Sequence, residues 1–268
     1  MYAKPFVTTL NTFNALVPAI SYFGYVELDR KWHGTNVLRP YNRLYLIEDG
    51  EGFISFDGKT VLLQPGNAYL VPAGLTSDFW CSTKMAKLYF HFNVYRPDNY
   101  DLFLSVHTVP HVPVSQETLA ALHAHGPGTS FADSMIIKHY FWQILTQMQQ
   151  AYGFANEPFP NYSKHVMDTI TYVKDHLSAS LQVEELAKQL FVSRSFLAAQ
   201  FRKEVGVSIG KYIDDQLMDA AKWRLGQSDA SIMEISQELG YTDHCYFSRR
   251  FKQLCGMTPQ VFRRRHRL

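Results

Sequence analysis

The sequence lacks the features of a secreted or membrane-spanning protein. It has 3 cysteines among 268 residues, an odd number without the spacing of metal ligands. This excludes a disulfide framework and favours a reducing compartment. No apolar run reaches membrane-spanning length, and the first residues do not form the apolar core of a signal peptide. We therefore expect a cytoplasmic protein without membrane contact.

Sequence motifs of catalysis are also missing. There is no nucleophile elbow, phosphate-binding loop or dinucleotide fingerprint. Only His91 falls within the predicted strands, and the histidines that follow are His107, His111, His123 and His125. A catalytic metal needs three converging ligands, and a surface role suits the His123 and His125 pair better. We expect no metal, no cofactor and no enzymatic activity.

Charge is nearly balanced overall but unevenly distributed. The formal net charge is +2. Residues 1–160 carry 10 Lys and Arg against 12 Asp and Glu, whereas residues 161–268 carry 16 against 12. The positive charge therefore lies in the second part of the chain, which favours nucleic-acid binding there.

One pattern occurs twice near the C-terminus. Residues 183–190 have apolar positions at helical spacing, and Ser193 caps a second helix over 194–203. The second copy has a helix over 232–239, a break at Gly240 and another helix beyond it. The offset is about 50 residues, with one extra residue in the second turn. Each copy predicts a helix, a tight turn and a helix.

The segment between the copies, residues 208–225, predicts one continuous helix with an apolar stripe. Such a helix would hold the two units at a fixed separation. Two recognition helices about one DNA turn apart, roughly 34 Å, can enter successive major grooves. Gly206 and Gly256 are placed as helix C-caps, and Thr258 with Pro259 opens a last short helix that ends in three arginines, 263–265.

The N-terminal part has the pattern of many short strands. They are predicted at 21–28, 43–47, 53–56, 59–63, 68–71, 76–81 and 86–94, with a turn at 48–52. This succession predicts a small β-barrel or jelly roll. Helices follow at 115–124 and 130–152, and the second has an apolar face made by Ile137, Phe141, Ile144, Leu145 and Met148. That face either packs on the barrel or forms a dimer.

The C-terminal block resembles the DNA-binding domain of the AraC/XylS transcription regulators. The second unit carries the specific residues: Ile232, Ile235, Ser236, Leu239, Gly240, Tyr241, Tyr246, Phe247, Ser248, Arg249, Phe251, Lys252, Gly256, Met257, Thr258, Pro259, Phe262 and Arg263. The N-terminal turns resemble those of the cupin-type sensor domain common in these regulators.

The resemblance implies an α+β protein of two domains. Residues 1–152 would form a cupin-like β-barrel or jelly roll with C-terminal helices, which senses a ligand and dimerises. Residues 153–161 would be a linker. Residues 162–268 would form an all-α domain with two helix-turn-helix units. The implied function is sequence-specific transcription regulation, as an activator, with a carbohydrate as the preferred effector.

The DNA-reading residues are predicted from the outward positions of each second helix. They are Arg194, Ser195, Ala198, Ala199 and Arg202 in the first unit, and His244, Cys245, Ser248, Arg249 and Lys252 in the second. The alanines depart from the long polar residues of relatives, so we expect weaker base reading by the first unit. Arg249 can grip a guanine through two hydrogen bonds or contact a phosphate instead. Arg264 is expected to contact the DNA backbone.

The ligand site is predicted at the barrel mouth. Arg39 followed by Pro40 resembles the Arg-Pro pair of arabinose-type sensors, in which the arginine contacts the sugar. Tyr41, Trp80 and His91 can supply stacking and hydrogen bonds, although core or rim positions are common for such residues.

The expected partners are double-stranded promoter DNA, a small-molecule effector, RNA polymerase and a second copy of the chain through the 130–152 helix. Three alternatives stay open at this point. The effector is another metabolite, such as an aromatic compound. A protein partner gates the N-terminal domain instead. Or a metal-dependent cupin enzyme is fused to a DNA-binding module, against which the lack of a histidine cluster argues.

Overall fold

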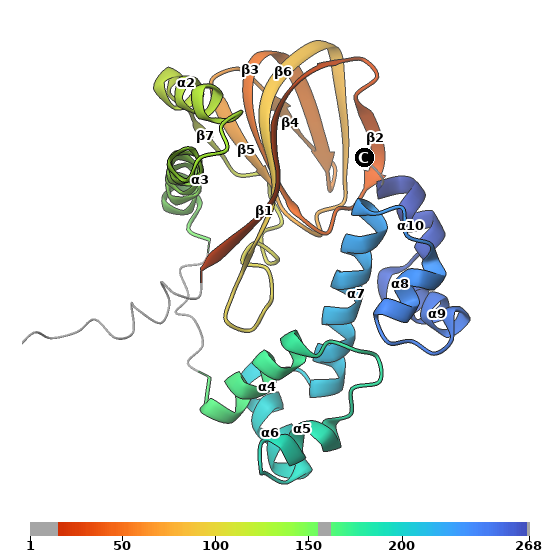
Figure 1. The fold of residues 1–268 in the computed structure, drawn as a ribbon. Coiled ribbons are helices and arrows are strands. Elements are labelled where there is room, and N and C mark those ends of the chain that lie inside the picture. The colour runs from red at the N-terminus through yellow and green to blue at the C-terminus, as the bar shows by residue number, and fades with distance from the viewer. Residues whose placement is uncertain (1–15, 155–161, 267–268) are drawn as a thin grey trace, which may run out of the picture. The chain divides into compact units, whose positions relative to one another are not determined.

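A computed structural model describes residues 16–154 and 162–266 (Figure 1). The chain divides into two compact units, Met1–Tyr95 with Tyr100–Pro158, and Arg96–Asn99 with Phe159–Leu268. The first unit contains an antiparallel sheet followed by helices, and the second is helical, which confirms the predicted α+β class. From residue 155 onward the predicted linker lies outside the described residues.

The first unit is built on one antiparallel sheet. Its strands are β1 (Val17–Asp29), β2 (His33–Val37), β3 (Asn42–Phe56), β4 (Lys59–Leu63), β5 (Asn67–Val71), β6 (Ser77–Tyr95) and β7 (His111–Pro113). Their order is β1-β6-β3-β5-β7, with β2 also pairing β6 and β4 also pairing β3. The long strands β3 and β6 therefore connect all the others.

Both faces of this sheet are buried, in two separate cores. One core contains residues from both ends of β3, such as Tyr45 and Phe56, together with Leu63 of β4 and Tyr69 of β5. Because both ends of β3 reach the same core, the sheet curls around it. We call this side the inner face. The other face carries Leu88, Phe90 and Phe92 of β6 and packs on helices.

The predicted turn at 48–52 was wrong, and so was the division of 76–94 into two strands. β3 and β6 each run through without interruption, with register shifts between Ile47 and Asp49 and between Gly50 and Gly52. At Gly50 the backbone has φ 69°, and a Cβ there would lie 2.0 Å from the carbonyl oxygen of Lys84. The glycine-rich stretch therefore serves as a β-bulge, where one strand bends against its neighbour.

Two helices cover the outer face of the sheet (Figure 1). They are α2 (Gln116–His125) and α3 (Phe131–Tyr152), and α3 starts with a capping box between Ser130 and Asp133. The apolar face predicted for this helix lies in the outer core, and Phe141 and Met148 are fully buried there. Of the two roles considered for that face, packing on the sheet is confirmed.

The second unit consists of α4 (Lys164–Asp175), α5 (Val183–Gln189), α6 (Arg194–Val205), α7 (Ile209–Gln227), α8 (Ile232–Glu238), α9 (His244–Cys255) and α10 (Pro259–His266). The side chains of Ser193, Ser208, Ser231 and Asp243 cap the starts of α6, α7, α8 and α9. The starts of α6, α7 and α8 lie within one residue of their predicted positions. The turns of both helix-turn-helix units differ in length by one residue, as the sequence indicates.

Helix α7 connects the two helix-turn-helix units, and its 19 residues span roughly 28 Å. Near its start, Tyr212 packs on Phe201 of α6 with ring centroids 5.4 Å apart. Near its end, Arg224 donates a hydrogen bond to Glu238 of α8 at 2.9 Å. The segment between α4 and α5, which leads into the first helix-turn-helix unit, also contacts the second, because the Ala179 N–H donates to the Leu239 carbonyl at 2.8 Å. Their spacing therefore rests on more than the connecting helix.

The turn of the second unit fits closely against this contact. Gly240 has φ 78°, and a Cβ there would lie 2.0 Å from Ser178 Oγ. In the first helix-turn-helix unit the corresponding position is Phe191, which adopts φ 55° with a side chain that is 97% exposed. A large residue is tolerated at that turn because nothing packs against it.

We predict that Gly240→Ala destabilises the chain more than Gly256→Ala. Both glycines have positive φ, which costs an alanine about 1–2 kcal/mol, but a Cβ at Gly256 meets nothing within 4 Å. Gly240→Ala must also displace Ser178, for a total of about 2–4 kcal/mol. Urea unfolding measures both free energies. Equal losses would show that the contact between the units is loose at this turn.

Candidate nucleic-acid interface and effector site

In helix α6, the residues predicted to read DNA in the first helix-turn-helix unit are exposed to solvent. Leu197 and Phe201 are fully buried and fix the inward face of the helix. The exposed residues are Arg194, Ser195, Ala198, Ala199 and Arg202. Arg194 forms an ion pair with Glu184 at 2.8 Å, with both side chains more than half exposed. The two alanines offer DNA only methyl groups, which suit thymine methyls and form no hydrogen bonds with bases.

Helix α9 has the same arrangement in the second helix-turn-helix unit. Phe247 and Phe251 are fully buried. His244, Cys245, Arg249 and Lys252 are exposed, and Ser248 is half-buried. Arg249 lies 3.9 Å from Asp243 and its side chain is 75% exposed, so it is available to a ligand on this face.

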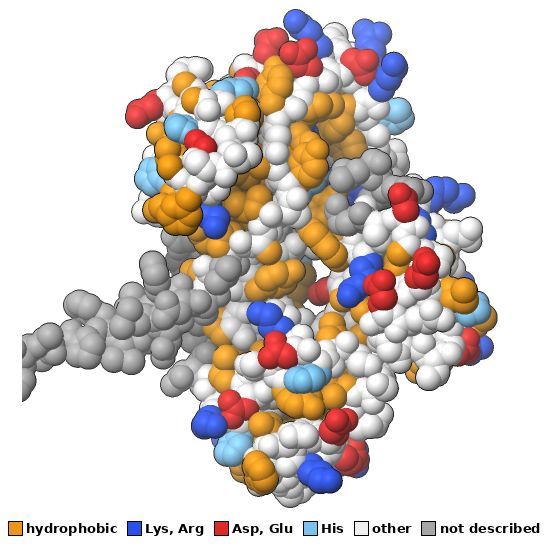
Figure 2. Space-filling view, in the orientation of Figure 1, with side chains coloured by type: hydrophobic (Ala, Val, Ile, Leu, Met, Phe, Trp, Pro, Cys, Tyr) orange, Lys and Arg blue, Asp and Glu red, His pale blue; other side chains and the backbone are white. Residues whose placement is uncertain are grey.

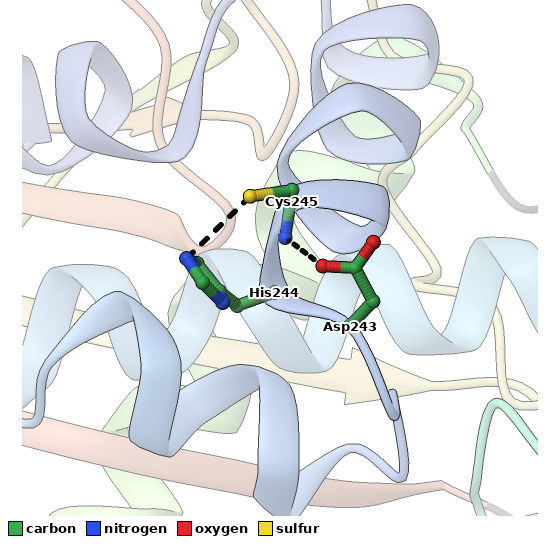
Figure 3. Close-up of side chains that lie close together, drawn as sticks. All are labelled: Asp243, His244 and Cys245. Atoms are coloured by element: carbon green, nitrogen blue, oxygen red, sulfur yellow. Dashed lines mark hydrogen bonds between the residues drawn. The ribbon is translucent and has the colours of Figure 1, made fainter.

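The start of α9 brings together Asp243, His244 and Cys245, the one group in the described residues with the composition of a metal site (Figure 3). Asp243 Oδ1 accepts the Cys245 N–H at 2.8 Å, and Cys245 Sγ lies 3.6 Å from His244 Nε2. The carboxylate therefore acts as the helix cap, and all three side chains are exposed where a recognition helix meets DNA.

Several cations near these helices have structural partners. Arg250 forms an ion pair with Asp214 of α7. Arg263 donates to the Ala230 carbonyl and so fastens α10 to the segment before α8. Arg264 is exposed, as a backbone contact requires, whereas the side chain of Arg265 lies outside the described residues. In Figure 2 positive and negative side chains are mixed over the helices of the second unit.

In the N-terminal unit, which contains the sheet, the structure brings together three of the four predicted ligand residues. Tyr41 and His91 lie with ring centroids 4.7 Å apart. Burial, followed by the charges of Arg43, Lys87 and Arg39, lowers the pKa of His91, so Arg39 belongs to the same surroundings. Trp80 lies elsewhere, because its neighbours Phe79 and Cys81 occupy the inner core and alternation turns Trp80 to the other side, where it stacks on Phe53 at 5.0 Å.

Two residues that the sequence reasoning missed, Arg43 and Lys87, belong to the same surroundings. Each is only 3% exposed. Lys87 Nζ lies 3.3 Å from the ring centroid of Tyr45 and 4.2 Å from that of Trp32. Burial, followed by the charge of Arg43, lowers the pKa of Lys87 well below its usual value. The signal in the sequence is a charged residue at an inward position of an otherwise apolar strand.

Burial also controls His91. It is 7% exposed, and burial together with the charges of Arg43, Lys87 and Arg39 lowers its pKa to about 3. His91 is therefore neutral at physiological pH, and its Nδ1 has no hydrogen-bond partner among the described residues. Burial raises the pKa of Tyr41, so this tyrosine is neutral as well.

A separate open groove of about 820 Å³ lies between the end of β1 and the middle of β3 and β6. Acidic residues Glu27, Asp29, Glu48 and Asp49 line it, together with Tyr25 and Trp32. None of the four predicted ligand residues lines this groove. Trp32 contacts both this groove and the surroundings of Lys87, because Lys87 Nζ lies over the Trp32 ring.

Comparisons with known proteins agree with the geometry of the second unit. A family model described as a helix-turn-helix domain matches residues 186–265. The chain is 26% identical over 234 residues to the arabinose operon regulatory protein of Salmonella typhimurium, covering 82% of each chain. It is 22% identical over 231 residues to the lactose operon transcription activator of Staphylococcus xylosus, again covering 82% of each.

A solved structure of similar fold spans both units. ToxT from Vibrio cholerae matches with a TM-score of 0.51 at 12% identity, over 92% of this chain and 99% of that one. At this identity the likeness concerns the fold alone. No helix in the described part of the chain is long and apolar enough to cross a membrane.

We predict that Arg249→Ala and Arg264→Ala weaken DNA binding in different ways. Loss of Arg249 should relax the preference at one base pair and cost about 1–3 kcal/mol on the preferred site. Loss of Arg264 should weaken specific and random DNA alike, because phosphate contacts carry no sequence information. Fluorescence anisotropy on both DNAs at fixed salt measures this. A uniform loss for both variants would place Arg249 on the phosphate backbone.

We also predict that His91 makes the first unit sensitive to acid. The folded pKa of about 3 lies below the unfolded value of 6.5, so the unfolded chain gains a proton as the pH falls below 6.5 and the folded chain does not. The free energy of unfolding therefore decreases from pH 6.5 towards pH 3, by about 2 kcal/mol at pH 5.

Urea unfolding at pH 7 and pH 5 compares His91→Gln with the wild type. The variant should lose less stability on acidification, whereas His107→Gln, at an exposed position, should behave as the wild type. An identical pH dependence in His91→Gln and the wild type would mean that His91 takes up its proton in the folded state.

Proposed function

Since this chain belongs to the AraC/XylS family of transcription regulators, we propose that it binds promoter DNA through α6 and α9 in response to a small-molecule effector. The preferred effector class is carbohydrate, and the regulator acts as an activator. The observation that carries the proposal is the pair of capped helix-turn-helix units held at fixed spacing by α7 and by the Ala179 to Leu239 contact.

The geometry of α7 supports binding by both units on one face of a duplex. Its length of roughly 28 Å is comparable with one turn of DNA, about 34 Å. The second unit carries the polar residues suited to bases, since His244, Arg249 and Lys252 are exposed on α9. The first unit contributes Arg194 and Arg202 at its surface and binds mainly through phosphates.

The N-terminal unit is the proposed sensor, with Arg39, Tyr41 and His91 as contacts to the effector. Their proximity on the inner face supports this assignment, and Trp80 is left out of it. Relatives named for arabinose and lactose operons support carbohydrate as the class, and the second of them is named as an activator.

The proposed partners include RNA polymerase and a second copy of the chain. The buried face of α3 is occupied by the sheet, so a dimer through this helix must use its other side. Phe131 is 81% exposed and Met135 is 57% exposed, one turn apart. Figure 2 shows hydrophobic side chains at the surface over α3. These two residues are the contacts that we propose for a homodimer.

The sensor proposal is tested by thermal unfolding of the full chain against a panel of sugars and aromatic metabolites. A ligand at about 100 times its dissociation constant adds roughly 2.7 kcal/mol, which raises the melting temperature of the responding unit by about 5–11 °C. Arg39→Ala should lose this shift, and Arg30→Ala, at an exposed position directly after β1, should keep it.

A chain that unfolds cooperatively but responds to no member of the panel would contradict the sensor proposal and favour control by a protein partner. DNA binding is measured separately, by enrichment of sites from a random double-stranded pool. Failure to enrich any sequence would contradict the regulator proposal itself.

A further inference from the structure

The inner face of the sheet carries a group of basic side chains, the buried Arg43, Lys87 and His91 and the half-buried Arg39, which we call the inner basic cluster. Arg43 is directly opposite His91 in the pairing of β3 with β6, and Ile47 is opposite Lys87. Directly opposite residues have Cβ atoms roughly 5 Å apart. Tyr45 lies between Arg43 and Ile47 on the same face, and Lys87 Nζ reaches over its ring.

No carboxylate neutralises this cluster within residues 16–154. The ion pairs of the described acidic residues do not include any of its four members. The charged or ionisable neighbours that act on them are one another, Tyr41, Tyr45 and Cys81. Three buried nitrogens of the cluster lack a hydrogen-bond partner among the described residues, Arg39 Nη1, Arg43 Nε and His91 Nδ1.

An uncompensated buried charge is costly, and proteins pair such charges or neutralise them. Lys87 and His91 have lowered pKa values, and Lys87 is also held by the Trp32 and Tyr45 rings. An arginine cannot avoid this cost by losing its proton, because it stays charged in proteins. Arg43 has one long hydrogen bond, 3.5 Å from Nη2 to Ser77 Oγ. The arginines therefore need a negative partner.

We propose that the effector bound at the inner face carries an oxyanion, a carboxylate or a phosphate monoester, which the guanidinium groups of Arg39 and Arg43 hold. This deepens the proposed sensor function and rests on it. The carbohydrate class then narrows to sugar acids or sugar phosphates. Guanidinium groups bind both kinds of oxyanion through paired hydrogen bonds. Neutral His91 supplies a further hydrogen bond, and the rings of Tyr41 and Tyr45 border the rest of the molecule.

The test uses the full chain and matched pairs of compounds at constant ionic strength. Hexoses and pentoses are compared with their phosphate monoesters and with the corresponding uronic and aldonic acids, with inorganic phosphate and acetate as minimal oxyanions. Thermal unfolding ranks the compounds, and calorimetry measures affinity. An acid or phosphate ester should stabilise the chain when its neutral parent does not, and the arm that responds identifies carboxylate or phosphate.

Charge variants locate the effect. Arg43→Met should weaken anion binding about tenfold or more, which corresponds to the loss of a charge-assisted hydrogen bond. Arg43→Lys keeps the charge and serves if the methionine variant does not fold; it should bind more weakly than the wild type but more tightly than Arg43→Met. Lys84→Met removes a charge from the exposed part of β6, where the side chain is 78% exposed, and should bind as the wild type does.

Three outcomes would overturn the inference. Neutral sugars stabilise the chain as well as their anionic derivatives, or no anion stabilises it beyond the ionic-strength control, or Arg43→Met and Lys84→Met bind anions equally. The proposed function is judged separately. Stabilisation by neutral sugars alone would keep the sensor and remove only its anion preference, and enrichment of DNA sites tests the regulator without any effector.

Discussion

Burial of both faces of one sheet is the constraint on which the first unit depends. Alternation along a strand sends successive side chains to opposite faces, so each residue in the buried parts of β3 and β6 must suit one of two cores. The face under α2 and α3 receives Leu, Phe and Val. The inner face receives a mixture of apolar, aromatic and basic side chains, including Arg43 and Lys87. Cations in the interior are costly to the fold, and their retention points to binding rather than stability.

The second unit solves a different problem, which is to hold two short helix pairs rigidly. Helices as short as α5 and α8 are marginal in isolation and depend on packing. Buried aromatic residues of α6 and α9 supply it, and α7 spans both pairs. The αL turn at Gly240 lets the second pair approach Ser178 closely. Because of this second contact, the spacing of α6 and α9 does not depend on the straightness of α7 alone.

The sequence predicted helices better than strands, for physical reasons. Helix starts are encoded locally by caps such as Ser193 and Asp243, and the repeat supplied an internal check. The turn expected at 48–52 failed because glycines mark both turns and bulges, and only the distant Lys84 decides between them. The same limit applies to the effector site. Trp80 was predicted as a ligand contact from its residue type alone. Whether Arg43 and Lys87 point to the inner face depends on pairing between strands that are far apart in the chain.

Formal charge overstates how much of the second unit is available to DNA. Arg224, Arg250 and Arg263 have partners inside the unit, and Lys164, Lys211 and Lys222 form ion pairs with neighbouring aspartates on their own helices. Arg202, Lys203 and Lys252 are exposed, and no ion pair involves them in the described part of the chain. These three lie on α6 and α9, and Lys174, Lys188 and Arg264, on α4, α5 and α10, are likewise exposed and outside the ion pairs of the described residues. The uncompensated positive charge therefore includes the two recognition helices, which adds to the modest excess of four charges after residue 160 in favouring contact with DNA.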